Sequence, residues 1–183
     1  EVPIFGAHNF QNLHAAYLIC QKLGLRDEEF LAAIPSFKGA ARRLEKLDSP
    51  RGYTAYLDFA HAPSKVKATV AAVRAQHSDA RLAVVLELHT FSSLNQAFLP
   101  EYAGSLEGAD EAVVYYDPHT FAIKKLPFLE EAEVAAAFAK PGLQIATTKE
   151  ALTEVLDSLD WPNMVVLFMS SGRFGGVAVR EWL

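Results

Sequence analysis

The stretch "LAVVLEL", residues 82–88, is apolar at almost every position. A second stretch, "MVVLFM" from Met164, has the same character. Successive side chains of a strand point to opposite faces of its sheet, so strands that are apolar throughout are buried on both faces. Such strands are typical of a parallel sheet that is covered by helices on both sides. These two stretches therefore predict an α/β fold.

Helical and strand patterns alternate around these two stretches, as in a three-layer α/β domain. The polar, turn-rich segment "DSPRG" separates residues 42–47 from 53–59, which predicts two paired strands. We expect further strands over 82–88, 111–116, 143–147 and from 164, and helices over 12–23, 27–34, 63–76, 95–106, 130–139, 149–159 and 177–183. The predicted architecture is a Rossmann-like, mostly parallel sheet, preceded by a short helical tail.

The composition excludes several classes of function. The chain has 183 residues, of which 51% are hydrophobic, and a formal net charge of −5. That size allows one compact core, or one domain plus a piece of another. A negative net charge without a block of Lys and Arg argues against nucleic acid and against an anionic membrane as partners. The apolar runs are too short to cross a bilayer.

Cys20 is the single cysteine, so the chain cannot form an internal disulfide. It stands among Ala, Tyr, Leu and Ile in a helical pattern, and we expect a buried structural thiol in a reducing compartment, the cytoplasm. The chain opens at Glu1 directly in front of a motif, which suggests a piece of a longer protein.

Polar residues follow three of the predicted strands. In open α/β sheets, ligands bind beyond the carboxyl ends of the strands. The residues found at these ends are Asp58 and His61; Glu87, His89, Thr90, Ser92 and Ser93; and Ser170, Ser171 and Gly172. We therefore expect a site at this edge of the sheet.

Structural roles explain several of the same residues equally well. His8, Asn9 and Asn12 could simply cap a helix. Asp58 could mark a strand exit, with Pro63 opening the next helix. The Gly-rich "SSGRFGG" is not a G-x-G-x-x-G fingerprint, and the six histidines and one cysteine lack the spacing of a zinc site.

Three motifs in order along the chain favour a functional interpretation. They are "G-x-H-N-x-x-N-x-x-A-A" from Gly6, "F-x-G-x-x-R-R-x-E" from Phe37 and "D-F-A-H-x-P" from Asp58. This combination resembles the Mur ligase family, ATP-dependent amide ligases of peptidoglycan synthesis and recycling. The resemblance spans almost the whole chain. It implies that residues 1–36 are the tail of the family's central ATPase domain and residues 37–183 its C-terminal domain.

The resemblance also implies the role of individual residues. His8, Asn9 and Asn12 would lie around the adenine of ATP, since an Asn offers both a donor and an acceptor to the base edge. Arg43 would face the nucleotide, and Asp58 would accept hydrogen bonds from the ribose hydroxyls. On the acceptor side, the residues expected to bind substrate are His61, His89, Ser92, Ser93, Ser171 and Gly172.

The implied reaction is phosphorylation of a carboxylate by ATP, followed by attack of an amine on the acyl phosphate. It requires Mg²⁺ and a lysine-bearing phosphate loop. The sequence contains no G-x-x-x-x-G-K-[ST], so we expect that loop, and the metal ligands, in a preceding part of the parent chain. The 183 residues alone are expected to be inactive.

Within the family, two stretches bear on the acceptor. Alanine-adding ligases usually carry arginines where this chain reads "ELHTFSSLN", and "MSSGRFGG" resembles the "MSNGGFGG" of a recycling ligase. The sequence therefore favours joining L-alanyl-γ-D-glutamyl-meso-diaminopimelate, a murein tripeptide, to UDP-N-acetylmuramate. Addition of L-alanine to the same nucleotide sugar is the alternative. A plain Rossmann-type nucleotide-binding module and a non-catalytic interaction domain are more distant alternatives. A phosphate loop and a central ATPase domain upstream in the gene would support the ligase, whereas a start codon just before Glu1 would rule it out.

Overall fold

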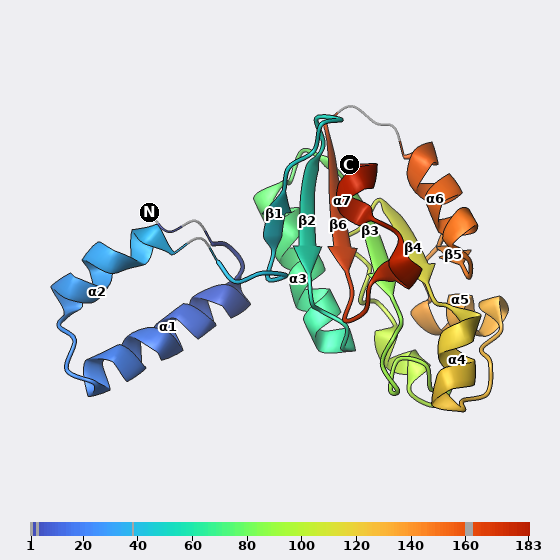
Figure 1. Ribbon diagram of the computed structural model, residues 1–183, viewed down its shortest axis with the longest axis horizontal. Coiled ribbons are helices and arrows are strands. Elements are labelled where there is room, and N and C mark those ends of the chain that lie inside the picture. Colours follow the sequence, from blue (N-terminus) through green and yellow to red (C-terminus); the bar gives the residue numbers. More distant parts are fainter. Residues whose placement is uncertain (1, 3, 38, 160–162) are drawn as a thin grey trace.

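The computed structural model describes residues 2, 4–37, 39–159 and 163–183. Its centre is a six-stranded sheet with the strand order β1-β2-β6-β3-β4-β5 (Figure 1). Only β1 runs antiparallel to its neighbour, and the other pairs are parallel. The strands are β1 (Glu45–Leu47), β2 (Thr54–Asp58), β3 (Arg81–Glu87), β4 (Glu111–Tyr115), β5 (Gln144–Ala146) and β6 (Met164–Met169). The predicted mostly parallel sheet is confirmed.

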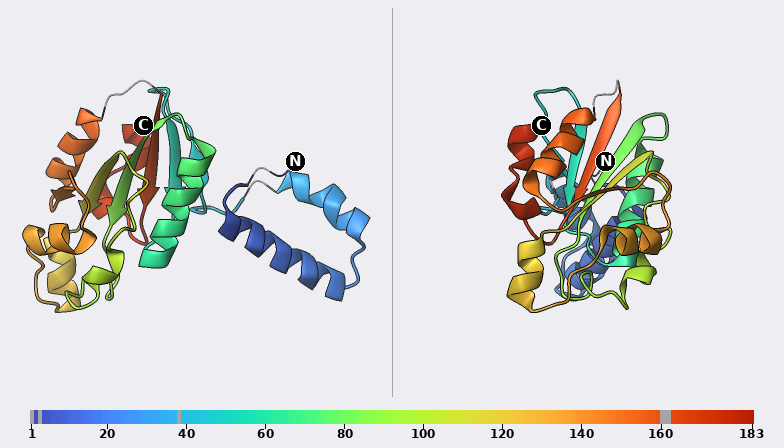
Figure 2. Two further views of the ribbon diagram at one scale, coloured as in Figure 1. Left: turned by 180° about the vertical axis from the view of Figure 1, so that it is seen from behind. Right: turned by 90° about the vertical axis from the view of Figure 1, so that its right-hand side faces the viewer.

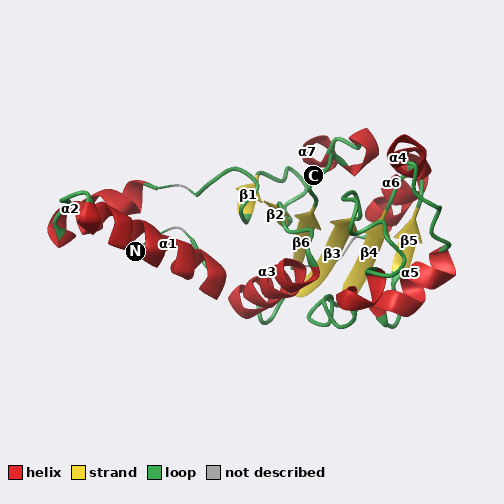
Figure 3. Cartoon of the chain, turned by 90° about the horizontal axis from the view of Figure 1, so that it is seen from below, coloured by secondary structure: helices red, strands yellow, loops and turns green. Residues whose placement is uncertain are grey.

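Helices cover both faces of the sheet, as Figure 3 shows from below. One face packs against α3 (Pro63–Gln76), α5 (Glu131–Phe138) and the 3-10 helix η2 (Leu99–Tyr102). The other face packs against α6 (Lys149–Ser158) and α7 (Val179–Trp182). Alternate residues of β3 enter the two cores, so an unbroken apolar strand is what this position requires. The three-layer architecture is thereby confirmed.

The first part of the chain lies apart from the sheet. Helices α1 (Ala7–Lys22) and α2 (Asp27–Ala33) form a hairpin, which ends in the 3-10 helix η1 (Ile34–Ser36) and projects from one side of the molecule (Figure 2). Both helices are fully described, and neither has a buried residue. Cys20 is accordingly only partly buried, and the prediction of a buried thiol was wrong. Its helical pattern indicated an apolar face but not what covers that face.

Three local predictions also need correction. Residues 95–106 form turns around the short η2 rather than one helix, because Pro100 lacks an amide hydrogen and Gly104 has a φ of 70°. Helix α4 (Pro118–Lys124) was not predicted, although Asp117 caps it by accepting from the amide of His119 at 2.8 Å. The first strand is limited to Glu45–Leu47, because Arg42 and Leu44 have positive φ angles.

The topology brings three strand ends together. Strand β6 returns last along the chain and lies between β2 and β3. In its register Met169 pairs with Asp58 on one side and with Leu86 on the other. The residues that follow β2, β3 and β6 therefore meet at one edge. Among the described residues, no helix is long and apolar enough to cross a membrane.

Candidate functional site

A first cavity, here called the hairpin cavity, lies between the start of α1 and the start of α3 and has a volume of about 260 Å³. All five residues predicted to bind nucleotide line it: His8, Asn9, Asn12, Arg43 and Asp58. They come from α1, from the segment before β1 and from the end of β2. Sequence reasoning did not select four other residues of its wall, Gln11, Ser64, Lys65 and Thr69.

The glycine of the first motif explains how α1 reaches this position. Gly6 has a φ of 90°, and a Cβ on it would lie 2.9 Å from the Cβ of Ala72 in α3. Only glycine allows both that backbone conformation and that approach. Gly6 is also the N-cap of α1, and no side chain caps the helix there. The side-chain amide of Asn9 instead donates from Nδ2 to the carbonyl of Phe5 at 2.9 Å, which fixes the turn before the helix.

Asp58 is 4% exposed and has a defined structural role. Its two carboxylate oxygens accept from the backbone amides of Leu44 at 2.8 Å and Ala60 at 2.7 Å. Leu44 has a φ of 46°, so the carboxylate stabilises an unfavourable backbone conformation next to the cavity. The interpretation of Asp58 as a strand-exit residue thus has direct support, alongside its place in the cavity wall.

Two neighbouring arginines share one aromatic ring. The guanidinium carbons of Arg42 and Arg43 lie 5.1 Å and 5.0 Å from the centroid of the Phe59 ring, within the range of a cation–π interaction. Arg43 is exposed and lines the hairpin cavity. Arg42 is half-buried and belongs to a second cavity. The two adjacent arginines therefore line two different cavities.

The second cavity, here called the sheet-edge cavity, has a volume of about 560 Å³ and lies beyond the ends of β3, β4 and β6. Three residues predicted to bind substrate line it: His89, Ser171 and Gly172. Its remaining wall includes both signs of charge. Glu87 was expected at this sheet edge, and Gly175 and Gly176 belong to the Gly-rich stretch noted in the sequence. The other residues of the wall were not predicted: Arg42, Asp117, Thr120 and Arg173. The carboxyl-end rule predicted the place of this cavity but not its charge pattern.

Glu87 is the buried carboxylate of this site, with 3% exposure. Its Oε2 accepts from the hydroxyl of Ser170 and from the amide of Phe174 at 2.9 Å. Its Oε1 lies 3.8 Å from Nδ1 of His89. A Cβ on Gly172 would come within 2.7 Å of Glu87 Oε2, so glycine is required where this loop passes the carboxylate. In the sequence, this site is indicated by a single acidic residue, Glu87, at the end of an apolar strand.

Two polar atoms near the sheet-edge cavity lack a partner. Among the described residues, Nε of Arg42 and Oγ of Ser171 are buried and make no hydrogen bond. Such gaps are commonly filled by ordered water or by a ligand. The hydroxyl of Tyr115 lies beside Gly175, and burial, with smaller contributions from Asp117, Glu87 and Glu150, raises the pKa of Tyr115 to about 12. Its hydroxyl therefore stays neutral at physiological pH.

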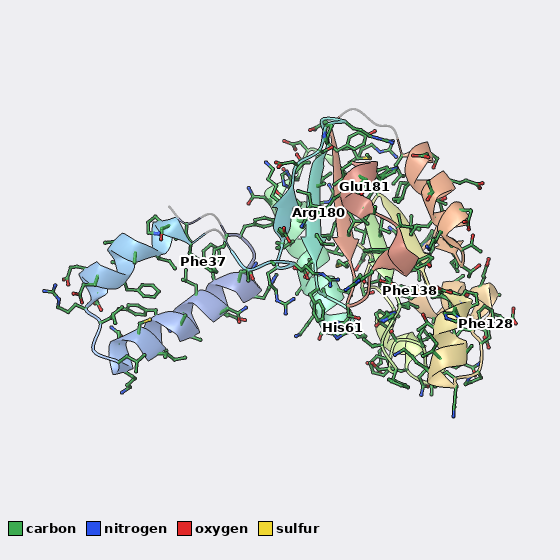
Figure 4. The ribbon with its side chains drawn as sticks, viewed as in Figure 1. Phe37, His61, Phe128, Phe138, Arg180 and Glu181 are labelled. Atoms are coloured by element: carbon green, nitrogen blue, oxygen red, sulfur yellow. The ribbon has the colours of Figure 1, made fainter. Side chains whose placement is uncertain are left out.

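Three predicted substrate-binding residues line neither cavity. Ser93 is fully buried and exchanges hydrogen bonds with Thr90, which closes the turn after β3, and Ser92 lies exposed on that turn. His61, labelled in Figure 4, holds its Nδ1–H on the carbonyl of Phe59 at 2.8 Å, which leaves Nε2 as an acceptor. These contacts give all three residues local structural roles, and their contact with substrate stays a prediction.

Comparison with known proteins shows to which family the chain is similar. The family model "Mur ligase, glutamate ligase domain" matches residues 42–172, more than half of the chain. The UDP-N-acetylmuramate–L-alanine ligase of Chlorobium phaeobacteroides is 31% identical over 188 residues, which cover 97% of this chain and 40% of that protein. The chain thus spans less than half the length of this curated relative.

Two solved structures are similar as well. The murein peptide ligase of Psychrobacter arcticus aligns with a TM-score of 0.68 at 21% identity, over 98% of this chain and 37% of that one. A domain assigned to a UDP-N-acetylmuramate:L-alanyl-γ-D-glutamyl-meso-diaminopimelate ligase of Haemophilus ducreyi aligns with a TM-score of 0.56 at 31% identity. That alignment covers 76% of this chain and 97% of the other.

Proposed function

Because the chain belongs to the Mur ligase family, we propose that it is the C-terminal part of an ATP-dependent amide ligase of peptidoglycan recycling. The full ligase would join L-alanyl-γ-D-glutamyl-meso-diaminopimelate to UDP-N-acetylmuramate in the cytoplasm. Mur ligases are ATP-dependent ligases. The observation that carries the proposal is the hairpin cavity, where residues from three distant motifs line one space.

In the proposed complex the hairpin cavity holds the nucleoside of ATP. His8, Asn9 and Asn12 offer donors and acceptors to the adenine edge. Arg43 places an exposed guanidinium beside the nucleotide. Asp58 retains lone pairs beyond its two backbone contacts, and these would accept from the ribose hydroxyls.

The sheet-edge cavity would take the acceptor. Its volume of about 560 Å³ lies within the range that encloses drug-sized ligands and is generous for a single alanine. Its guanidinium groups suit the carboxylates of a peptide, and its carboxylates suit ammonium groups. A murein tripeptide carries both kinds of group. We therefore propose that His89, Ser171 and Gly172 bind the tripeptide, and that His61, Ser92 and Ser93 lie on the same side.

The proposed reaction has two steps. A carboxylate oxygen of UDP-N-acetylmuramate attacks the γ-phosphorus of ATP, which gives an acyl phosphate and ADP. The amine of the acceptor then attacks the acyl carbon, phosphate leaves, and the nitrogen loses a proton to give the amide. In this scheme the present chain orients the nucleoside and the amine, since holding reactants in position is a large part of phosphoryl- and acyl-transfer catalysis.

The rest of the parent chain is the partner that this scheme requires. Seven of the ten exposed large apolar side chains among the described residues lie in residues 10–37, and such a surface marks an interaction site. We propose that residues 1–36 complete a central ATPase domain. Mg²⁺ would neutralise charge on the phosphates, but the described residues contain no group of three or more His, Cys, Asp or Glu side chains that could hold it. The metal ligands would therefore come from that domain.

Addition of L-alanine is the second candidate. It is favoured by the Chlorobium phaeobacteroides relative, an L-alanine ligase that aligns with nearly all of this chain. Against it, no arginine occurs between β3 and Arg173, so the turn after β3 offers imidazole and hydroxyl groups but no guanidinium. Arg42 and Arg173 reach the cavity from other segments. A guanidinium on that turn would be the natural partner for the carboxylate of a free amino acid, which lies next to the attacking amine.

Phosphate release by the full-length parent tests these two candidates. With ATP, Mg²⁺ and UDP-N-acetylmuramate, we expect kcat/KM for the tripeptide to exceed that for L-alanine by about a hundredfold, the effect of one or two charge-assisted contacts. Reactions without UDP-N-acetylmuramate and with glycine serve as controls. Equal or faster turnover of L-alanine would replace the recycling reaction with alanine addition. No release with any acceptor would contradict both.

A further inference from the structure

We propose that Arg42 is a positioning residue for the acceptor, because it holds the loop of residues 170–174 that forms one wall of the sheet-edge cavity. This inference rests on the proposed function. It assigns a role to the arginine that the motif does not single out, while its neighbour Arg43 serves the hairpin cavity. Arg42 would then act on the acceptor, and Arg43 on ATP.

Two side chains, Arg42 and Glu87, hold this loop by hydrogen bonds. Nη2 of Arg42 donates to the carbonyl of Ser170 and, at 3.0 Å, to the carbonyl of Gly172. Glu87 accepts from the Ser170 hydroxyl and from the amide of Phe174, and the amide of Gly172 donates to the Ser170 hydroxyl at 2.7 Å. Two carbonyls of the loop thus bind Arg42, and the Phe174 amide and the Ser170 hydroxyl bind Glu87. Loss of either set of contacts would free the wall that the acceptor contacts.

Arg42 is itself fixed by its surroundings. Its backbone has a φ of 55°, its amide donates to Oε2 of Glu45 at 2.9 Å, and its carbonyl accepts from the amide of Phe59 at 2.9 Å. Glu45 in turn binds Arg180 at 2.6 Å. These contacts fix the backbone of Arg42, and the carbonyls of Ser170 and Gly172 hold its guanidinium, which is therefore a rigid support rather than a mobile surface charge.

A guanidinium suits this geometry. Its Nη2 donates to two carbonyls of the loop while its central carbon lies over the Phe59 ring. A lysine would keep the charge, but its ammonium ends one bond nearer the backbone and has no plane to stack on that ring, so it would not reproduce both contacts. Arg42→Lys therefore separates the shape of the group from its charge.

The test compares Arg42→Lys with the matched variant Arg43→Lys in the full-length parent. For Arg42→Lys we expect the KM for the tripeptide to rise about tenfold, the loss of roughly one charge-assisted contact, and the KM for ATP to stay within about twofold. Arg43→Lys should show the reverse pattern. ADP–ATP exchange in the presence of UDP-N-acetylmuramate, without acceptor, reports the first step alone and should be unchanged in Arg42→Lys.

Ser170→Ala provides a second route that leaves every charge in place. It removes the hydroxyl between Glu87 and Gly172, so it should also raise the KM for the tripeptide and not that for ATP. In both variants, amide hydrogen exchange of a peptide covering residues 169–176 should be faster than in wild type, whereas Arg43→Lys should leave it unchanged.

An unchanged KM for the tripeptide in Arg42→Lys would overturn the proposal, as would an equal loss in acceptor use and in ADP–ATP exchange, which indicates general destabilisation. Absence of ADP–ATP exchange in the wild-type parent is a separate outcome. It would refute the proposed ligase function and, with it, the role of Arg42 toward an acceptor.

Discussion

The helical hairpin of residues 7–36 and the α/β domain that follows are built on different principles. No residue of α1 or α2, both described in full, is buried, whereas each of the six strands contributes at least one buried residue. The domain has its own two-sided core, but the hairpin carries exposed Phe, Leu and Ile side chains. The domain therefore has a core of its own that can stabilise it, while the hairpin has none.

The largest expected effect is a difference in local stability between these regions. In the isolated 183-residue chain, amides of α1 and α2 should exchange at least about 1,000-fold faster than amides of β3 and β6, since hairpin opening exposes almost no core. Hydrogen exchange with mass spectrometry would measure this. Limited proteolysis should first cut before Phe37, the boundary expected from the sequence. First cuts within the strands and helices after residue 42 would contradict both the comparison and the domain assignment.

Substitution of one glycine in each region should give a smaller difference, in the free energy of unfolding. Gly24 in the hairpin and Gly175 near the sheet-edge cavity both have positive φ, 93° and 60°. A Cβ on Gly24 meets nothing within 4 Å, but on Gly175 it would lie 2.0 Å from the Tyr115 hydroxyl. Gly175→Ala should lower the free energy of unfolding by about 2–4 kcal/mol, from backbone strain plus overpacking. Gly24→Ala should leave the domain's urea transition unchanged.

The glycine pair also has an internal control. Tyr115→Phe removes the oxygen that the new Cβ would meet, so the double variant should recover about 1 kcal/mol of the loss caused by Gly175→Ala. Equal losses for Gly24→Ala and Gly175→Ala in urea denaturation would mean that the hairpin unfolds together with the domain.

The sequence predicted those features that leave a pattern in neighbouring residues. Strands β3 and β6 are apolar throughout because both their faces are buried, and burial of that kind is visible in the residues themselves. Five residues of the hairpin cavity were chosen through motifs that recur in a family, and the structure brings them to one space. Arg42 was missed because its partners lie 128 and 130 positions later, and nothing local distinguishes it from Arg43. Ser92 and Ser93 were predicted from their place after a strand and from the family resemblance, and neither separates a turn residue from a residue of a binding wall.

The hairpin cavity is lined by residues of both regions. The two regions can therefore be compared within one site, where the smallest effects are expected. Asn12 comes from the hairpin and is exposed, and its side chain makes no hydrogen bond with the described residues. Asp58 comes from the domain and holds two backbone amides. If the regions differ as argued, Asn12 serves ligand binding alone, whereas Asp58 serves binding and folding together.

Asp58→Asn and Asn12→Ala should therefore separate in the full-length parent. Asp58→Asn keeps the size but replaces one acceptor oxygen by a donor, so a backbone amide loses its partner and the free energy of unfolding should fall by about 1–3 kcal/mol. Its KM for ATP should also rise about tenfold, from loss of the charge that the ribose hydroxyls would bind. Asn12→Ala should raise the KM for ATP without a loss of stability, because alanine is the better helix former. Urea denaturation and initial rates at varied ATP measure both quantities. An Asp58→Asn variant that is less stable but has an unchanged KM for ATP would restrict Asp58 to the strand exit, and the hairpin residues would then have to bind the nucleoside together with Arg43.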